Sequence, residues 1–375
     1  MQAKNSKFFR VKIFLDNRYV FIYTSLKQGG KMKKIFVVLF ALLVFLPSAW
    51  SKTITVYNFG KKIEIKNPDR FVVLFPQALP FVFMINASDG LVGYPGMGRN
   101  AVPYFSGQLI LKKMPDFLKK VIDVGYPFGP SIEKIVALKP GFIVNVNMQA
   151  DNEQFEKLGI PVIGFSACFG NLNDLYQSIN SLGEATNHVK DAQKLISYYK
   201  HTVEYVESHL NGIKEKPKVL YLSYQGPKGN KLTSGGQFDT LVNDIIQKAG
   251  GISVSRNVKG KFGQISKEDI LKWQPDFILL GSGNKKTIQN IYADKDLRYV
   301  AAIIHKRVYL VPQDGGSLYS NWFAPEKAPL GLLWCAKLLH PQRFKSLNLK
   351  SQADYYYKTF WNINPDEIHI IGLKN

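Results

Sequence analysis

The chain has 375 residues but only two cysteines, Cys168 and Cys335, and six histidines. Two cysteines cannot form a disulfide framework, and a chain of this length does not need one to fold. The histidines and cysteines show no HxH, HExxH or CxxC spacing, so a zinc or copper site built wholly from side chains is poorly supported. We therefore expect both cysteines to be small buried hydrophobic residues rather than reactive thiols.

Acidic residues are scarce, because 28 Asp and Glu face 49 Lys and Arg, which gives a formal net charge of +21. Such a surplus makes nucleic acid and anionic membrane surfaces candidate partners. Residues 1–51, however, hold nine of the bases and one acid, so the remaining 324 residues carry 40 bases, 27 acids and a net charge of +13. The basicity is thus a weaker argument for those partners, and we expect no nucleic-acid partner.

Residues 32–51 read MKKIFVVLFALLVFLPSAWS and have the pattern of a secretory signal peptide. Two lysines precede an apolar run of 12 residues, 35–46, and small residues lie at the −3 and −1 positions of a cleavage site after Ser51. A bilayer span needs about 20 apolar residues, so a permanent anchor is the weaker alternative. We expect translation to start at Met32, residues 1–31 to be a non-translated leader, and the mature chain to be exported.

Short apolar segments alternate with helical patterns in two regions of the chain, residues 52–184 and residues 216–375. This alternation is typical of a mainly parallel sheet with helices on both faces. It predicts an α/β protein with two three-layer lobes, an N-terminal and a C-terminal one. The predicted strands are residues 71–75, 91–94, 142–146 and 162–165 in the first lobe, and 219–224, 277–280 and 308–311 in the second.

Residues 187–212 carry the clearest periodic signal and predict one long helix between the lobes. The apolar residues are spaced by 3, 4, 3, 4, 3 and 4 positions, which places them on one face of a helix. A single connecting helix leaves little room for hinge bending, and we expect a monomer; a coiled-coil dimer is the competing interpretation. The stripe consists of Val189, Ala192, Ile196, Tyr199, Val203, Val206 and Leu210.

Two segments resemble signature elements of the periplasmic substrate-binding proteins that serve ABC importers of iron-siderophores, haem and cobalamin. They are IDVGYPFGPSIEKIVALKPGFIV (residues 122–144) and GQISKEDILKWQPDFILLG (residues 263–281). AGGIS (249–253), PLGLLWCAKLLHPQRF (329–344) and DYYYKTFWNI (354–363) match further elements in the family's order. The resemblance implies two lobes bridged by one long helix, a metal chelate held between them, no resident cofactor, and delivery to a membrane permease without catalysis. An iron-siderophore is the expected chelate, with haem, cobalamin and nickel chelates as alternatives.

Ligands of open parallel sheets bind beyond the carboxyl ends of the strands, so the loops there contain the candidate contacts. Aromatic side chains offer flat faces with a polar edge, and Arg99 offers a planar fork for carboxylate or catecholate oxygens. Core packing is the competing role for each aromatic residue, and solvent exposure without function is the competing role for Arg99. Whether a side chain ligates the metal stays open, with tyrosine the best candidate. The candidate ligand contacts are Tyr94, Arg99, Tyr126, Gln149, Tyr224, Tyr319 and Trp322.

The resemblance also implies one acidic residue on each lobe that engages arginines of the permease. These residues correspond to Glu133 in PSIEKI and Glu268 in SKEDIL. Each acid falls in the first turn of a predicted helix, where the helix dipole favours it in any case. The recurrence at the same place in both lobes favours docking.

Two other classes of function remain as alternatives. A periplasmic enzyme is disfavoured, because the sequence has no Gly-x-Ser-x-Gly elbow, zinc-protease helix or Walker loop. Binding to nucleic acid or to a membrane surface would weaken steeply with salt, whereas chelate binding in a closed cleft would change only modestly.

Overall fold

The computed structural model divides the chain into two units, Met1–Ser51 and Lys52–Asn375. The first unit contains a three-stranded antiparallel sheet of β1 (Phe9–Asp16), β2 (Tyr19–Gln28) and β3 (Lys31–Val37), in that order. Strand β3 covers the first part of the predicted signal peptide, and both the leader and the signal peptide stay predictions. The structure describes residues 9–16, 19–28, 31–37, 53–96, 106–147, 149–225, 231–234, 240–259, 263–315 and 321–373.

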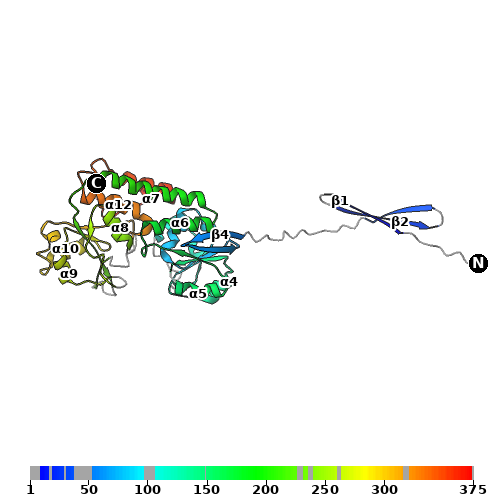
Figure 1. Ribbon diagram of the computed structural model, residues 1–375, viewed down its shortest axis with the longest axis horizontal. Coiled ribbons are helices and arrows are strands. Elements are labelled where there is room, and N and C mark those ends of the chain that lie inside the picture. The colour runs from blue at the N-terminus through cyan, green and yellow to red at the C-terminus, as the bar shows by residue number, and fades with distance from the viewer. Residues whose placement is uncertain are drawn as a thin grey trace, which may run out of the picture. The chain divides into compact units, whose positions relative to one another are not determined.

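The second unit contains two α/β lobes (Figure 1). The N-terminal lobe is built on a parallel five-stranded sheet in the order β12–β11–β6–β7–β8. The antiparallel strands β4 (Thr53–Asn58) and β5 (Lys61–Lys66) form a separate hairpin in the same lobe. The sheet strands are β6 (Phe71–Val73), β7 (Leu91–Tyr94), β8 (Ile122–Asp123), β11 (Phe142–Val146) and β12 (Val162–Phe165). The helices are α1 (Leu79–Met84), α2 (Gly107–Lys113), α3 (Phe117–Lys120), α4 (Ile132–Ala137), α5 (Gln149–Lys157) and α6 (Leu172–Ala185), and β9 (Gly125–Tyr126) pairs with β10 (Gly129–Pro130).

The C-terminal lobe has a mixed sheet in the order β14–β13–β16–β17, in which only β14 runs antiparallel to its neighbour and β15 pairs with β13. The strands are β13 (Lys218–Gln225), β14 (Lys231–Ser234), β15 (Ile252–Ser253), β16 (Phe277–Leu280) and β17 (Val308–Leu310). The helices are α8 (Thr240–Lys248), α9 (Lys267–Trp273), α10 (Lys285–Ala293), α11 (Ala301–Ile304), α12 (Ala328–Leu339) and α13 (Leu349–Tyr356). The predicted α/β class with mainly parallel sheets is confirmed.

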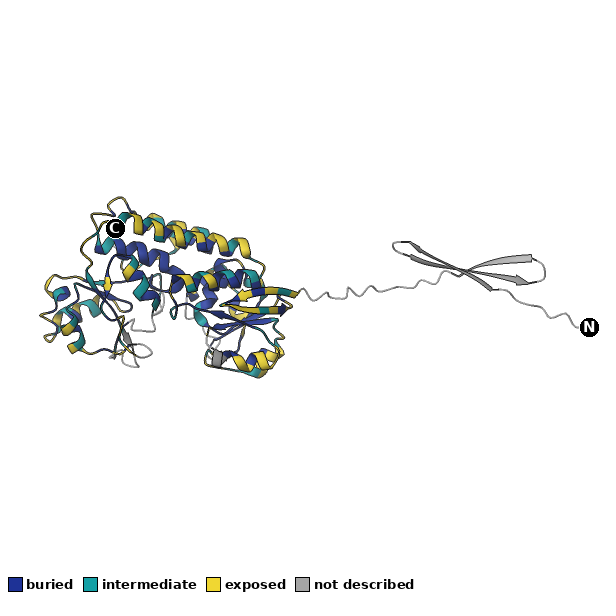
Figure 2. Cartoon of the chain, viewed as in Figure 1, coloured by how far each residue is buried: buried dark blue, intermediate teal, exposed yellow. Residues whose placement is uncertain are grey.

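The helix predicted between the lobes is α7 (Val189–Leu210). Most of its apolar stripe is buried within the same chain, where α7 contacts α6, α12 and α8, whereas Val189 at its start is 44% exposed. Figure 2 shows an exposed outer face on α7 and a buried layer beneath it. These contacts account for the stripe without a coiled-coil partner.

One hydrophobic core is continuous through both lobes, since it includes β6 and α1 from the first and β13, α8 and α12 from the second. The C-terminal segment adds to this continuity. Helix α13 continues as a π-helical turn, Tyr357–Trp361, which contacts α1 of the N-terminal lobe. The Tyr356 hydroxyl lies 3.8 Å from the Met84 sulfur. Packing as well as α7 therefore holds the two lobes together.

Candidate functional site

The loops that follow β6 and β12 in the N-terminal lobe are joined at the carboxyl edge of the sheet. The Gln77 side-chain oxygen accepts a hydrogen bond of 3.1 Å from the backbone N–H of Cys168. The rings of Phe75 and Phe169 stack beside it with their centroids 6.0 Å apart. Parallel strands bring these loops to one edge, which is where ligands of such sheets bind.

The C-terminal lobe meets the same loop through α8. The carbonyl oxygen of Cys168 lies 3.4 Å from the Thr240 hydroxyl and 3.5 Å from the Leu241 N–H. The carboxylate of Asp244 accepts from the N–H of Leu172 at 3.1 Å. Cys168 is half-buried rather than fully buried as expected, whereas Cys335 is fully buried and burial raises the pKa of its thiol.

A buried charge cluster, which consists of Asp314, Glu326 and Lys327, forms a second junction between the lobes. The Lys327 ammonium lies 3.0 Å from an Asp314 oxygen and 3.4 Å from a Glu326 oxygen, and the three side chains are between 0% and 3% exposed. The Ser106 hydroxyl, at the start of α2, donates to the same Glu326 oxygen at 2.7 Å across the lobe boundary. Buried charges persist only when they are paired in this way.

Three tyrosines complete this cluster from α7 and the C-terminal segment. Tyr199 donates to the Glu326 carbonyl at 2.9 Å, as does Tyr356, and Tyr357 donates to the Asp314 carboxylate at 2.6 Å. Burial raises the pKa of all three phenols well above the ordinary value. Burial alone would lower the pKa of Lys327, but the neighbouring carboxylates reverse this and raise it, so the lysine stays charged.

Two residues of this junction, Ser106 and Asp314, lie close in sequence to segments that contain predicted ligand contacts. Ser106 directly follows residues 97–105, which include Arg99, and Asp314 precedes residues 316–320, which include Tyr319. Arg99 and Tyr319 themselves lie outside the described residues. Sequence reasoning missed Glu326 and Lys327, although an acid and a base inside the otherwise apolar run NWFAPEKAPLGLLW were a signal of paired burial.

The other predicted contacts fall into three situations. Tyr126 on β9 is 54% exposed. Tyr94 and Trp322 are 1% and 0% exposed and belong to the hydrophobic core. Tyr94 packs edge-on against Phe117 with ring centroids 4.7 Å apart, and burial beside Asp123 raises its pKa to about 12. Gln149 begins α5 and Tyr224 lies within β13, and their side chains lie outside the described part of the chain.

The two predicted docking acids occupy equivalent positions. Ser131 caps α4 and Ser266 caps α9, and the glutamate two residues later, Glu133 or Glu268, is exposed in the first turn. In Figure 1, α4 and α9 lie on the side of the two-lobed unit opposite α7, one on each lobe.

Within the described residues, no group of three or more His, Cys, Asp and Glu side chains is arranged to hold a metal ion. Among the same residues, no helix is long and apolar enough to span a bilayer. The chemistry that the described junction offers is hydrogen bonding, aromatic contact and fixed charge.

Comparison with known proteins extends this description. A family model described as "Periplasmic binding protein" matches residues 104–314. The molybdate-binding protein MolA of Haemophilus influenzae is 24% identical over 340 residues, which cover 84% of this chain and 92% of that protein. The high-affinity heme uptake system protein IsdE of Staphylococcus aureus is 26% identical over 204 residues, which cover 53% of this chain and 68% of IsdE.

Solved structures show the same fold. MolA bound to molybdate aligns with a TM-score of 0.67 at 22% identity, over 84% of this chain and 98% of that one. Helicobacter pylori CeuE in a nickel–histidine complex aligns with a TM-score of 0.63 at 22% identity, over 84% of this chain and 98% of CeuE. The named ligands differ among these relatives, so the likeness concerns the fold.

Proposed function

This chain belongs to the periplasmic binding protein family, and we propose that it serves an ABC importer by capturing a metal chelate between its two lobes. The family implies an exported protein, in the periplasm or outside the cell. The chelate that we propose is a ferric siderophore, with haem, cobalamin and nickel chelates as the alternatives that a binding experiment separates. We assign no catalytic step to the protein.

The observation that carries this proposal is the double junction between the lobes. The Cys168 carbonyl meets α8 on one side, and Ser106 meets Glu326 on the other. Cys168 follows β12 at the carboxyl edge of the N-terminal sheet, and Glu326 follows β17 in the C-terminal lobe, so the two contacts fix one lobe against the other. A ligand held there would touch both lobes at once, as a carrier without a hinge requires.

The composition of residues 52–375 and the exposed Tyr126 support an anionic chelate with a flat organic shell. Residues 52–375 carry a net charge of +13, which favours negatively charged ligands. Exposed Tyr126 offers an aromatic face, and we propose Arg99, Gln149, Tyr224 and Tyr319 as further contacts. Tyr94 and Trp322 are in the core, so in this proposal they stabilise the fold near the ligand and do not contact it.

We further propose that Glu133 and Glu268 dock the protein onto the permease. Each is exposed at the second position of a helix on its own lobe, and the helices share one side of the unit (Figure 1). This arrangement leaves the carboxylates free for arginines of a membrane partner, one on each lobe.

The proposal is tested by titrating the purified protein with a defined panel of chelates. The panel contains ferric catecholate, ferric hydroxamate, haem, cobalamin, nickel–histidine and molybdate, and the readouts are tryptophan fluorescence and melting temperature. We expect quenching and a higher melting temperature with a ferric siderophore, because a ligand that binds only the folded state stabilises it. A response to another compound alone would replace the siderophore, and no response to any compound would contradict chelate transport.

A further inference from the structure

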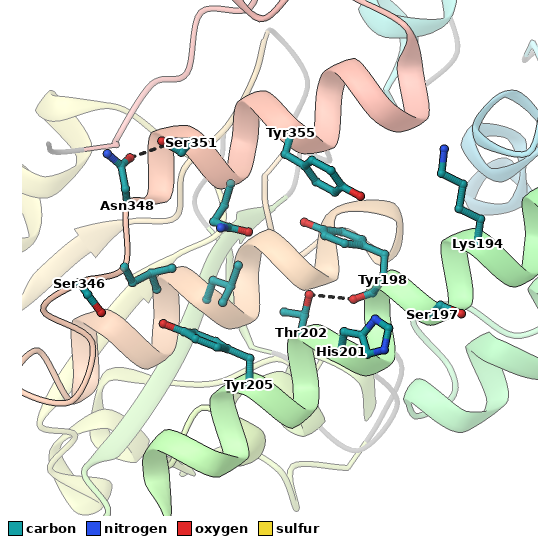
Figure 3. Close-up of a pocket in the computed structure, with 13 residues that line it drawn as sticks. Lys194, Ser197, Tyr198, His201, Thr202, Tyr205, Ser346, Asn348, Ser351 and Tyr355 are labelled. Atoms are coloured by element: carbon teal, nitrogen blue, oxygen red, sulfur yellow. Dashed lines mark hydrogen bonds between the residues drawn. The ribbon is translucent and has the colours of Figure 1, made fainter.

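A groove of about 740 Å³ lies between α7 and α13, with α12 at its base (Figure 3). Among the described residues, no loop at the carboxyl edge of either sheet lines it, and its lining shares no residue with the site proposed above. Its volume falls in the range of about 300–1,000 Å³ that is usual for small-molecule sites. The groove is thus large enough for a second ligand.

Tyr198 on α7 contributes an unusual group to this groove. Its hydroxyl is buried, and within the part of the chain that the structure describes it has no hydrogen-bond partner. Figure 3 shows the ring reaching from α7 toward α13, with the hydroxyl directed between the two helices. A buried hydroxyl without a partner destabilises a folded protein, so an acceptor supplied by a ligand would remove that penalty.

The walls of the groove are aromatic and its floor is apolar. The ring of Tyr198 lies 5.8 Å from that of Tyr355, which is 52% exposed, and Tyr205 lines the groove one helical turn further along α7 from Thr202. Leu333 forms part of the buried floor. Such walls favour a planar ring, which can pack against tyrosine faces at a separation typical of aromatic pairs.

The charged groups around the groove favour a negative ligand. Lys194 and His201 are among its lining residues, and the described lining includes no carboxylate. The first turn of α13 also faces it, where Asn348 accepts from the Ser351 N–H at 3.0 Å. The N-terminal end of a helix carries partial positive charge, which attracts anions.

We propose that this groove binds a small organic anion with a planar ring. The ring lies against Tyr198, Tyr205 and Tyr355, and an anionic oxygen accepts the hydrogen bond of the Tyr198 hydroxyl. This proposal does not depend on the identity of the transported solute.

Isothermal titration of the protein with salicylate, and with neutral salicylamide in parallel, tests the proposal. We expect salicylate to bind and salicylamide to bind at least about tenfold more weakly, because only the first carries a full negative charge. Absence of binding by salicylate, or equal binding of the two compounds, would overturn it.

Substitution of Tyr198 tests whether salicylate binds in this groove rather than at another tyrosine on the surface. Tyr198→Phe keeps the ring and removes the unpartnered hydroxyl, so salicylate affinity is expected to fall about tenfold while the melting temperature stays equal or rises. Tyr299→Phe makes the same change at a tyrosine that is 65% exposed and outside the groove, and it serves as the control. Unchanged salicylate affinity in Tyr198→Phe, or a lower melting temperature than in Tyr299→Phe, would show that the Tyr198 hydroxyl does not donate a hydrogen bond to a bound anion.

A second pair of variants tests the charge argument without touching the aromatic wall. Ser351→Asp places a carboxylate in the first turn of α13, where the helix tolerates it well, but it would repel an anion. Ser351→Asn is the neutral control. We expect salicylate affinity to fall about tenfold in the aspartate variant relative to the asparagine variant. Equal affinities would contradict an anion site.

Discussion

Charged side chains serve opposite purposes in two regions of this molecule, the lobe junction and the outer helices α4 and α9. At the junction, Lys327 is 0% exposed and is held by two carboxylates and a surrounding shell of tyrosines. On the outer helices, Glu133 and Glu268 are exposed and are placed by nothing more than a serine cap and a helix end. Buried charges here join one lobe to the other, whereas the exposed charges are those that we propose for docking.

The largest effect is expected from reversing the exposed charges. Glu133→Arg combined with Glu268→Arg would abolish uptake, because the permease would meet like charges, while chelate affinity stays within about twofold of the wild type. Uptake of labelled chelate by cells and titration of the purified variant measure the two effects. Glu204→Arg combined with Glu215→Arg changes the net charge equally at other exposed positions and is the matched control.

Retained uptake in that double variant would show that the outer acids do not dock the protein. Loss of chelate affinity would instead place them at the ligand, and the contrast between the two regions would disappear.

Removing the buried charge is expected to affect stability rather than uptake. Lys327→Met leaves Asp314 and Glu326 as unpaired buried carboxylates, which costs about 3–5 kcal/mol in the free energy of unfolding. Lys272→Met, on the exposed surface of α9, is the control and is expected to change it by about 0.5 kcal/mol or less. Chemical denaturation measures both variants, and similar values for the two would contradict a structural role for the cluster.

The smallest expected effect is a pH dependence at a second lysine near the junction. Lys113 donates to the carbonyl of Phe83 at 2.6 Å and to that of Phe360 at 3.4 Å, and burial lowers its pKa to about 8 from 10.5, although Asp191 opposes the shift. Below pH 8 the lysine is protonated in both states, so the cost of burying its charge is fully present. Between pH 8 and 10.5 the unfolded chain binds more protons, so stability rises with pH through this group.

Lys113→Met removes that rise, so the stability of the wild type relative to the variant should increase between pH 8 and 10. Denaturation of both proteins across this range measures the difference. Parallel curves would show that burial does not disfavour the charged amine, and Lys113 would then resemble the exposed lysines.

Local patterns in the sequence predicted much of the fold. Helix α7 spans Val189–Leu210, which are the bounds of the predicted stripe and lie just inside the predicted helix of residues 187–212. The strands β7, β11, β12 and β16 have the predicted bounds, because buried parallel strands are short unbroken apolar runs. Helix α6 was not predicted, because its pattern is interrupted by polar residues and by Gly183. A Cβ at that glycine would lie 2.4 Å from the Cβ of Ala192, so close packing on α7 decides the residue there rather than helix propensity.

The candidate site was harder to predict from the sequence, because burial depends on contacts between distant segments. The hydrogen bond between Ser106 and Glu326 spans 220 residues, and no local pattern indicates it. For the same reason, the aromatic character of Tyr94 and Trp322 was interpreted as a ligand surface, although tertiary packing places both in the core.

The contact between Tyr356 and Met84 joins residues that are 272 positions apart, and the turn that follows Tyr356 completes the packing around α1. A growing chain therefore lacks part of the support for its N-terminal lobe until almost all of it has been synthesised. Incomplete packing exposes apolar surface and keeps a chain far from its stable state. For an exported protein, this delay would favour passage across the membrane before folding. The two lobes would then pack fully only after α13 has been made and has crossed the membrane.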